Sequence, residues 1–228
     1  MSSSRFTHTE PFHNRDFTSQ VVHLNYRLAH SLPKAHVLRL KEAYDIALQA
    51  AGRNDQAMLR QWFPAATAPL TVDDVKDHFF IQYDELLHRV TNGPMFLAEQ
   101  AAKEEVKKSW LHFQRLGMIE VIALCVMSNH VHVLLRHPSP EGVTSFKALL
   151  ERHKQFTGTQ INRLQRAKGR DVWAGKGFDR DVRPGTFWKV FWYIVNNPVK
   201  AGLTQEPLRW RGTWVQPGLI NGTNILEV

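Results

Sequence analysis

Apolar and polar positions alternate over Val21–Leu28, which is the pattern of a strand with one buried face. Three segments with the helical spacing of apolar residues follow, at about 36–51, 71–90 and 94–116. Thr71 precedes an acidic first turn and is a residue type that caps helix N-termini. We therefore expect a helical block at about residues 34–116 between the first strand and the next one.

Two apolar runs come next, Ile119–Val126 and His130–Arg136, and the turn-prone pair Ser128-Asn129 joins them. A basic amphipathic helix is expected over 144–167, and a short aromatic helix over 186–203. Between these helices the chain is rich in glycine, and we expect irregular structure there. This order of elements indicates an α+β fold, an antiparallel sheet with helices packed on it.

Composition excludes several classes of protein. Apolar residues make up 43% of the 228 residues and charged residues 22%, a globular balance, and no apolar run is long enough to span a bilayer. The N-terminal segment is polar and lacks the apolar stretch of a secretion signal. The single cysteine, Cys125, lies in an apolar run and fits a reducing compartment. We expect a cytoplasmic protein.

The last third of the chain carries all of the net charge of +8. Residues 1–144 hold 15 Lys and Arg against 15 Asp and Glu, whereas residues 145–228 hold 14 against 6. Because the basic part is also rich in aromatic residues, it favours a polyanionic partner, most simply nucleic acid. A basic face that serves only solubility is the alternative reading.

Two histidines, His130 and His132, begin one of the apolar runs. Side chains i and i+2 of a strand project from the same face, so both imidazoles can reach one divalent ion. Two ligands are too few for a closed structural zinc site, and a metal here would need a third ligand from elsewhere. Two polar residues that merely face water are the competing reading.

Lys189, Tyr193 and Asn197 follow one another at intervals of four residues, which places them in a stripe on the aromatic helix. Tyr193 can be a structural aromatic whose hydroxyl is satisfied by its neighbours. It can also be a covalent nucleophile, with Asn197 as the third metal ligand. Asn197 precedes Pro198, which biases it away from helical backbone angles.

Four segments in matching order resemble the REP-associated tyrosine transposases, which are HUH single-tyrosine transposases. They are "VHLNYRLAHSLP", "VMSNHVHVLL", "VWAGKGFDRDVR" and "YIVNNPVKAGL", and the resemblance runs from about Val21 to Trp214. Ser128 stands where the family's histidine motif usually has proline. The resemblance implies one domain over 1–228 with a ferredoxin-like HUH nuclease core, a helical insertion at about 34–116 and a basic C-terminal part at 145–228.

The resemblance also implies a site. His130 and His132 match the metal ligands, Tyr193 matches the nucleophile, and Asn197 falls where a further ligand often lies. The expected cofactor is Mg²⁺ or Mn²⁺, with no small-molecule cofactor. The expected substrate is single-stranded or hairpin DNA with palindromic repeats, cleaved and rejoined through a 5′-phosphotyrosine link. Seven basic residues are expected to hold the DNA: Lys147, Arg152, Lys154, Arg180, Arg183, Lys189 and Lys200.

The same resemblance implies a bacterial, nucleoid-associated protein in the cytoplasm, acting as a monomer or homodimer away from membranes. Two other functions fit the residues. One is a catalytically inactive nucleic-acid-binding protein with the same fold. The other is a metal-dependent phosphodiesterase that forms no covalent intermediate, in which Tyr193 is structural.

Overall fold

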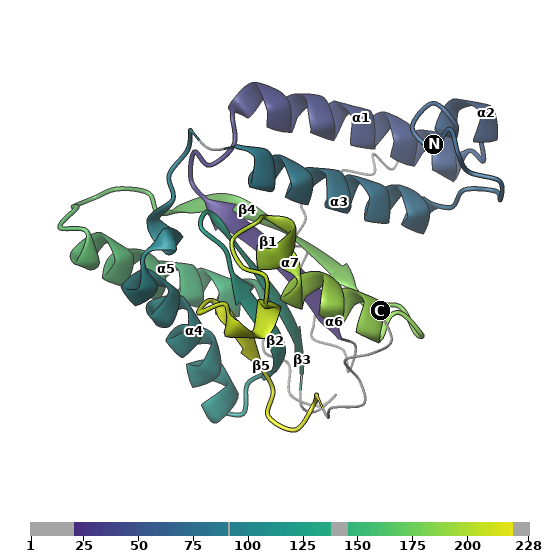
Figure 1. Ribbon diagram of the computed structural model, residues 1–228. Helices are drawn as coiled ribbons and strands as arrows, with labels where there is room; N and C mark the ends of the chain where they lie inside the picture. The colour runs from purple at the N-terminus through teal and green to yellow at the C-terminus, as the bar shows by residue number, and fades with distance from the viewer. Residues whose placement is uncertain (1–20, 91, 138–145, 221–228) are drawn as a thin grey trace, which may run out of the picture. The chain divides into compact units, whose positions relative to one another are not determined.

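The computed structural model describes residues 21–90, 92–137 and 146–220 (Figure 1). The chain divides into two compact units. The sheet unit comprises Met1–Ala29 and Pro94–Val228, and the helical unit comprises His30–Gly93. Within the described residues, no helix is both long and apolar enough to cross a bilayer.

The sheet unit is built on five antiparallel strands in the order β4-β1-β3-β2-β5. Their bounds are Val22–Leu28 (β1), Glu120–Val126 (β2), His130–Arg136 (β3), Trp173–Asp181 (β4) and Thr213–Val215 (β5). Within this unit, β1 to β4 alternate with helices as β-α-β-β-α-β and lie in the order 4-1-3-2, which is the ferredoxin-like arrangement. The expected α+β fold with an antiparallel sheet is confirmed.

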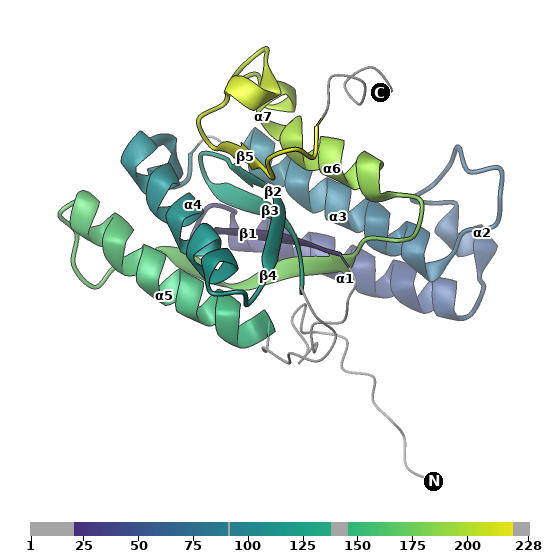
Figure 2. The same cartoon turned by 90° about the horizontal axis from the view of Figure 1, so that it is seen from below.

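One face of this sheet packs against α4 (Gln100–Arg115) and α5 (Phe146–Leu164). Strand alternation sends Leu24, Tyr26 and Val133 into this core, which is apolar apart from a small hydrogen-bonded network. We call it the helix-pair face. Figure 2 shows α4 and α5 together on this side of the sheet.

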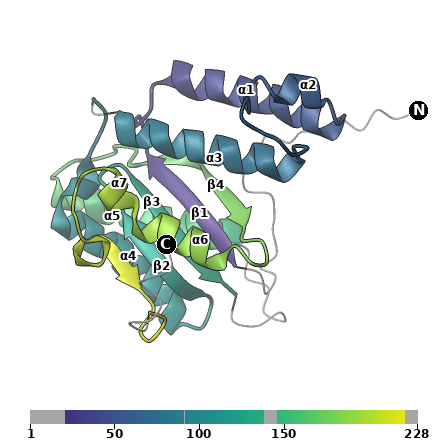
Figure 3. The ribbon, with the colours of Figure 1, turned by 45° about the vertical axis from the view of Figure 1, so that its right-hand side comes forward.

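The opposite face carries the alternate residues of the same strands, and we call it the histidine face. The register sets Asn25 opposite His132 and His23 opposite Leu134, so all four side chains project from this side. Leu134 packs there against α6 (Phe187–Val195). Figure 3 shows α6 crossing the sheet on the side away from α4 and α5. The short helix α7 (Asn197–Lys200) follows directly.

The helical unit contains α1 (Lys34–Gly52), α2 (Gln56–Leu59) and α3 (Val72–Arg89). A small apolar core joins them through Ala47, Ala50, Leu59, Val75 and Phe79. Thr71 caps α3 as expected, because its hydroxyl accepts from the Asp74 amide while the Asp74 carboxylate accepts from the Thr71 amide.

Two features differ from what the sequence pattern predicts. The glycine-rich segment, which was expected to be irregular, contains β4. Gly175 and Gly177 disfavour a strand by themselves, and hydrogen-bonded pairing with β1 stabilises it. Helix α4 lies in the expected helical block 34–116 but belongs to the sheet unit, where it packs on β2 and α5. Two single turns, η1 (Phe96–Ala98) and η2 (Pro207–Arg209), complete this unit.

Candidate active site on the histidine face

His130 and His132 lie side by side on the histidine face, as their spacing predicts. Both are buried, and their ring centroids are 4.9 Å apart with the planes nearly perpendicular. Perpendicular neighbouring imidazoles can each direct a ring nitrogen to a common point beside the sheet. The site therefore starts from a pair of histidines on rigid, central backbone, because β3 is hydrogen-bonded on both sides.

The turn before β3 fixes the orientation of His130. Asn129 is buried, and its Oδ1 lies 2.6 Å from His130 Nδ1. Since an amide oxygen only accepts, Nδ1 carries the proton and the lone pair of His130 is at Nε2. The amide of Met127 donates to the carbonyl of His130 and closes the turn. The Ser128-Asn129 turn thus sets the tautomer as well as the direction of the strand.

His132 is oriented by a third histidine that the sequence reading did not single out. His23 on β1 is buried, and its Nε2 lies 3.0 Å from His132 Nδ1, with ring centroids 5.2 Å apart. If His132 donates this hydrogen bond, its lone pair also resides at Nε2. His23, Asn25 and Arg27 alternate in the sequence with apolar residues. This alternation places His23 on the polar face of the first strand and could have identified it as a candidate site residue.

Tyr193 on α6 reaches the same group. Its ring centroid is 6.1 Å from that of His132 and 6.1 Å from that of His23. The ring is half-buried, and the Lys200 ammonium lies 4.0 Å from its centroid. The ammonium thus makes a cation–π contact with the ring. Four residues from three separate segments of the chain thus form one cluster.

Asn197 is fully buried just beyond α6. Its side-chain Nδ2 donates to the carbonyl of Tyr193 at 2.9 Å, which ties the amide to the turn that carries the tyrosine. The other amide atom, Oδ1, is buried and accepts no hydrogen bond from any residue in the described part of the chain. A buried carbonyl-type oxygen with no partner is costly in a folded protein, and a cation is one way to satisfy it.

Pro198 does not turn Asn197 away from the helical path. Helix α6 ends at Val195, Asn196 keeps right-handed helical angles, and α7 begins at once with Pro198 in its first turn. Proline is tolerated there because the first amides of a helix have no intrahelical partner.

The seven basic residues expected at DNA do not form one surface of the sheet unit. Lys147, Arg152 and Lys154 belong to α5, on the helix-pair face. Arg180 is opposite His23 in the β1–β4 register and so shares the histidine face. Arg183 is exposed after β4, and the exposed Lys189 and Lys200 flank Tyr193 on α6 and α7.

Lys154 is held inside the sheet unit. Its ammonium donates to the carbonyls of Ala174 and Gly175, at 2.8 and 3.3 Å, and lies over the Tyr26 ring. Burial, with a smaller effect of the Arg27 charge, lowers the pKa of Lys154 to about 8. The Lys154 ammonium therefore anchors the start of β4 through these two carbonyls.

No family model matches the chain, and no curated protein matches it either. Among solved structures, the chain is similar to one titled as a REP-associated tyrosine transposase bound to a REP hairpin. The TM-score is 0.45 with 12% identity, and the similarity covers 89% of this chain and 80% of the other.

Proposed function

We propose that this protein is a DNA transposase and endonuclease that cleaves and rejoins single-stranded or hairpin DNA through a 5′-phosphotyrosine intermediate. The observation that carries the proposal is the position of the Tyr193 ring, 6.1 Å from His132 on the face that also carries His130. A phenol beside a pair of oriented imidazoles is a nucleophile placed next to ligands for a divalent ion.

The side chains present fit a catalytic divalent ion. His130 and His132 would bind it through Nε2, and Asn197 would add the buried Oδ1 that has no partner among the described residues. Nitrogen and oxygen ligands without a thiolate suit Mg²⁺ or Mn²⁺ better than a soft metal, and imidazoles favour Mn²⁺ of the two. When bound, the ion would polarise the scissile phosphate and offset its developing charge.

In the proposed step, the Tyr193 oxygen bonds to the phosphorus of the scissile phosphodiester as the bond from phosphorus to O3′ breaks. The phenol loses its proton to solvent, and the departing O3′ takes one up as a 3′-hydroxyl. The Lys200 ammonium, 4.0 Å from the tyrosine ring centroid, favours the phenolate that attacks. The same step in reverse, with another 3′-hydroxyl, rejoins the strands, so no nucleotide cofactor is needed.

The DNA would be held by cations that flank the tyrosine. Lys189 and Lys200 are exposed on α6 and α7, and Arg180 projects from the same face of the sheet as His23. Phosphate contacts of this kind position a strand without reading its sequence. The DNA partner, the single-tyrosine chemistry and the metal are parts of one proposal.

The direct test is Tyr193→Phe, assayed with a labelled hairpin oligonucleotide that has single-stranded flanks, in Mn²⁺. The wild-type protein should give a DNA adduct that survives denaturing electrophoresis, and the variant should give none. Cleavage should fall by at least about 10³-fold while hairpin affinity stays within about twofold, because only one oxygen is removed. Tyr44→Phe, which removes a half-buried phenol of the helical unit, is the matched control and should cleave normally.

Each other result identifies a competing function. Cleavage by Tyr193→Phe at the wild-type rate, with no adduct from either protein, would establish a phosphodiesterase without a covalent intermediate. Tight binding of the hairpin by the wild-type protein, with neither cleavage nor adduct in Mn²⁺ or Mg²⁺, would establish a binding protein that performs no chemistry.

A further inference from the structure

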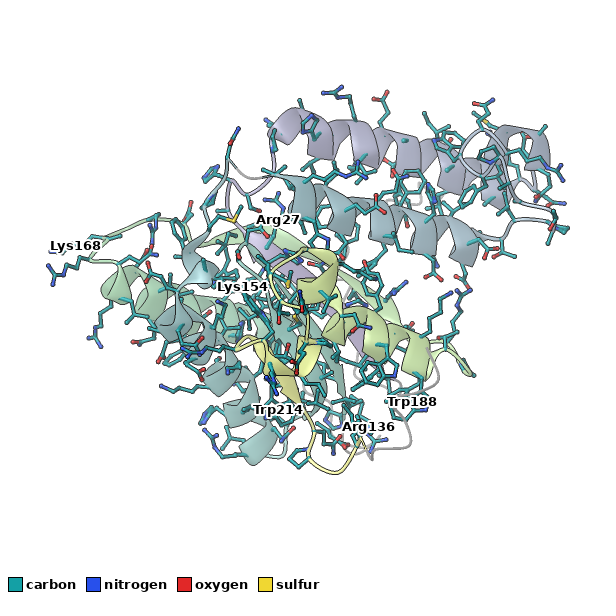
Figure 4. All side chains as sticks on the ribbon, viewed as in Figure 1. Arg27, Arg136, Lys154, Lys168, Trp188 and Trp214 are labelled. Atoms are coloured by element: carbon teal, nitrogen blue, oxygen red, sulfur yellow. The ribbon has the colours of Figure 1, made fainter. Side chains whose placement is uncertain are left out.

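A second basic feature of the sheet unit lies away from the histidine face. The C-terminal half of α5, the turn after it and the start of β4 line an open groove of about 860 Å³. Lys168 projects from the tip of this turn, as Figure 4 shows. Residues 154–175, which include the lining, contain five Lys and Arg and one acidic residue, Asp171.

Three of these cations are available to a ligand. Arg163, Arg166 and Lys168 are exposed, and none is in an ion pair with a carboxylate anywhere in residues 21–90, 92–137 or 146–220. The sequence reading included none of the three among the DNA-binding residues. Three neighbouring positive charges without a counter-charge repel one another, and a polyanion relieves that repulsion.

The other two cations build the walls of the groove. Arg170 donates to Asn162 Oδ1 at 3.1 Å and to Gln165 Oε1 at 2.7 Å, and its guanidinium lies 3.7 Å from the centroid of the Phe96 ring. Lys154 is held by backbone carbonyls of β4. The groove therefore has a fixed shape, with its exposed charges at the rim.

Arg166 occupies a backbone position that favours glycine. Its φ is +51°, in the left-handed region. The amide of Ala167 donates to the carbonyl of Asn162, and that of Arg166 donates to the carbonyl of Arg163, which together form the Schellman motif that ends α5. A side chain is disfavoured at this position relative to glycine. Arg166 therefore places a long cationic side chain at a position where glycine would make the fold more stable.

We infer that this groove binds the phosphate backbone of nucleic acid, as a contact separate from the chemistry at Tyr193. Helix α5 packs on the helix-pair face, whereas the histidines lie on the other side of the sheet. The partly exposed Trp173 donates its indole N–H to Thr157 at 2.9 Å and so is committed to the groove wall. The exposed cations at its rim therefore offer positive charge, which suits the phosphate backbone of nucleic acid.

The identity of the polyanion rests on the proposed function, since an enzyme that acts on hairpin DNA must also hold the paired stem. Cations at the rim of a concave groove fit a curved strand of phosphates. A membrane surface would instead be met by a convex basic face with apolar side chains projecting from it.

The test uses Arg166→Gly and a blunt 20-base-pair DNA duplex, followed by fluorescence anisotropy without metal over a range of salt concentrations. Removing one phosphate contact should weaken binding by about threefold to tenfold and reduce the slope of log K against log salt by about 0.9. The melting temperature should stay the same or rise by about 2 °C, because glycine relieves the left-handed backbone. Loss of binding with unchanged or increased stability separates a contact from a folding defect.

Asn54→Gly is the matched control. Asn54 has φ +55° in the helical unit, so the substitution gives similar backbone relief and removes no charge. Its duplex affinity should equal that of the wild-type protein. The combined variant Arg163→Gln, Arg166→Gly, Lys168→Gln should lose about 2.7 from the salt slope.

Duplex binding by the combined variant equal to wild type would overturn the inference. So would loss of binding to phosphatidylserine vesicles in place of loss of DNA binding, since that would make the groove a membrane contact. The binding assay contains no metal and needs no cleavage. If Tyr193 proves not to cleave DNA, the groove variants should therefore still bind the duplex more weakly than the wild-type protein. The two proposals therefore fail separately.

Discussion

The two faces of the sheet each bury histidine, and they use it in different ways. On the helix-pair face, His153 of α5 is fully buried with both ring nitrogens hydrogen-bonded, Nε2 to the Tyr26 hydroxyl at 2.6 Å and Nδ1 to the Ser109 hydroxyl at 2.9 Å. Its ring stacks on Trp110, whose indole N–H donates to Tyr26. This network closes on itself within the core.

On the histidine face, hydrogen bonds orient the rings of His130 and His132 beside Tyr193. Asn129 engages Nδ1 of His130, and His23 engages Nδ1 of His132, so the same nitrogen is held in both rings. Tyr193 stands next to them, and Asn197 donates to its carbonyl through Nδ2. The Asn197 Oδ1 accepts no hydrogen bond from any of the described residues. Burial is common to both faces. What distinguishes the histidine face is that a neighbour orients each ring through Nδ1, which under the proposed function leaves Nε2 of each ring to bind the metal.

The protonation behaviour follows from the same difference. Burial lowers the pKa of His153 well below its usual range, and the nearby Lys154 charge lowers it further. Burial also raises the pKa of Tyr26, which the hydrogen bond from Trp110 only partly offsets. The helix-pair network is therefore neutral at physiological pH, as a structural core cluster should be.

The largest expected contrast comes from removing one imidazole on each face. His132→Ala should reduce cleavage by at least about 10³-fold, because a metal contributes several kcal/mol to phosphate activation. His153→Ala should instead lower the free energy of unfolding by about 3 kcal/mol, since it leaves a cavity and removes one hydrogen-bond partner from each of two buried hydroxyls. The measurements are single-turnover cleavage and urea unfolding of both variants.

The rate per folded molecule of His153→Ala, measured at low temperature, should equal that of the wild-type protein. A large loss of cleavage in His153→Ala with full stability would erase the distinction between the two faces. If His132→Ala cleaves DNA at the wild-type rate, the proposed metal site is contradicted.

A smaller effect is expected at His23, which orients a ligand without being one. His23→Leu should weaken Mn²⁺ binding by about 10- to 100-fold, because it removes the hydrogen-bond partner of His132. His23→Gln keeps an acceptor and should recover most of the affinity. Isothermal titration of metal-free protein with Mn²⁺ measures the change independently of activity.

If His23→Leu and His23→Gln bind Mn²⁺ as tightly as the wild-type protein, the contact with His132 has no role in the site. A wild-type protein that binds no Mn²⁺ would instead contradict the metal proposal itself.

The smallest effect concerns the pH dependence of stability. His153 stays neutral when folded, whereas in the unfolded chain it binds a proton below about pH 6.5. The unfolded state then binds more protons, so the free energy of unfolding should fall by up to about 1.4 kcal/mol for each pH unit below 6.5. His153→Gln should flatten this dependence. Urea unfolding at pH 7, 6 and 5 gives the slopes, and equal slopes for both proteins would place the titrating group elsewhere.

Much of the fold follows from local pattern. Alternation over Val21–Leu28 predicts β1, the apolar run His130–Arg136 predicts β3, and the Thr71 cap predicts the start of α3. Strand β4 was missed because its glycines interrupt the alternation, and because hydrogen bonds to β1 stabilise it. The paired residues of β1 and β4 are 145 to 159 positions apart in sequence, from Leu28 with Trp173 to Val22 with Asp181, and no local pattern records the pairing.

The candidate site divides in the same way. The sequence alone determined that His130 and His132 share a face, because a strand has a period of two, and that Tyr193 and Asn197 share a helical stripe. Only the tertiary structure decided that Tyr193 lies beside His132, that His23 contacts His132, and that His153 belongs to a closed core network. The physical reason is one of range: backbone geometry fixes which side chains point together along one element, whereas packing of distant elements decides what they point at.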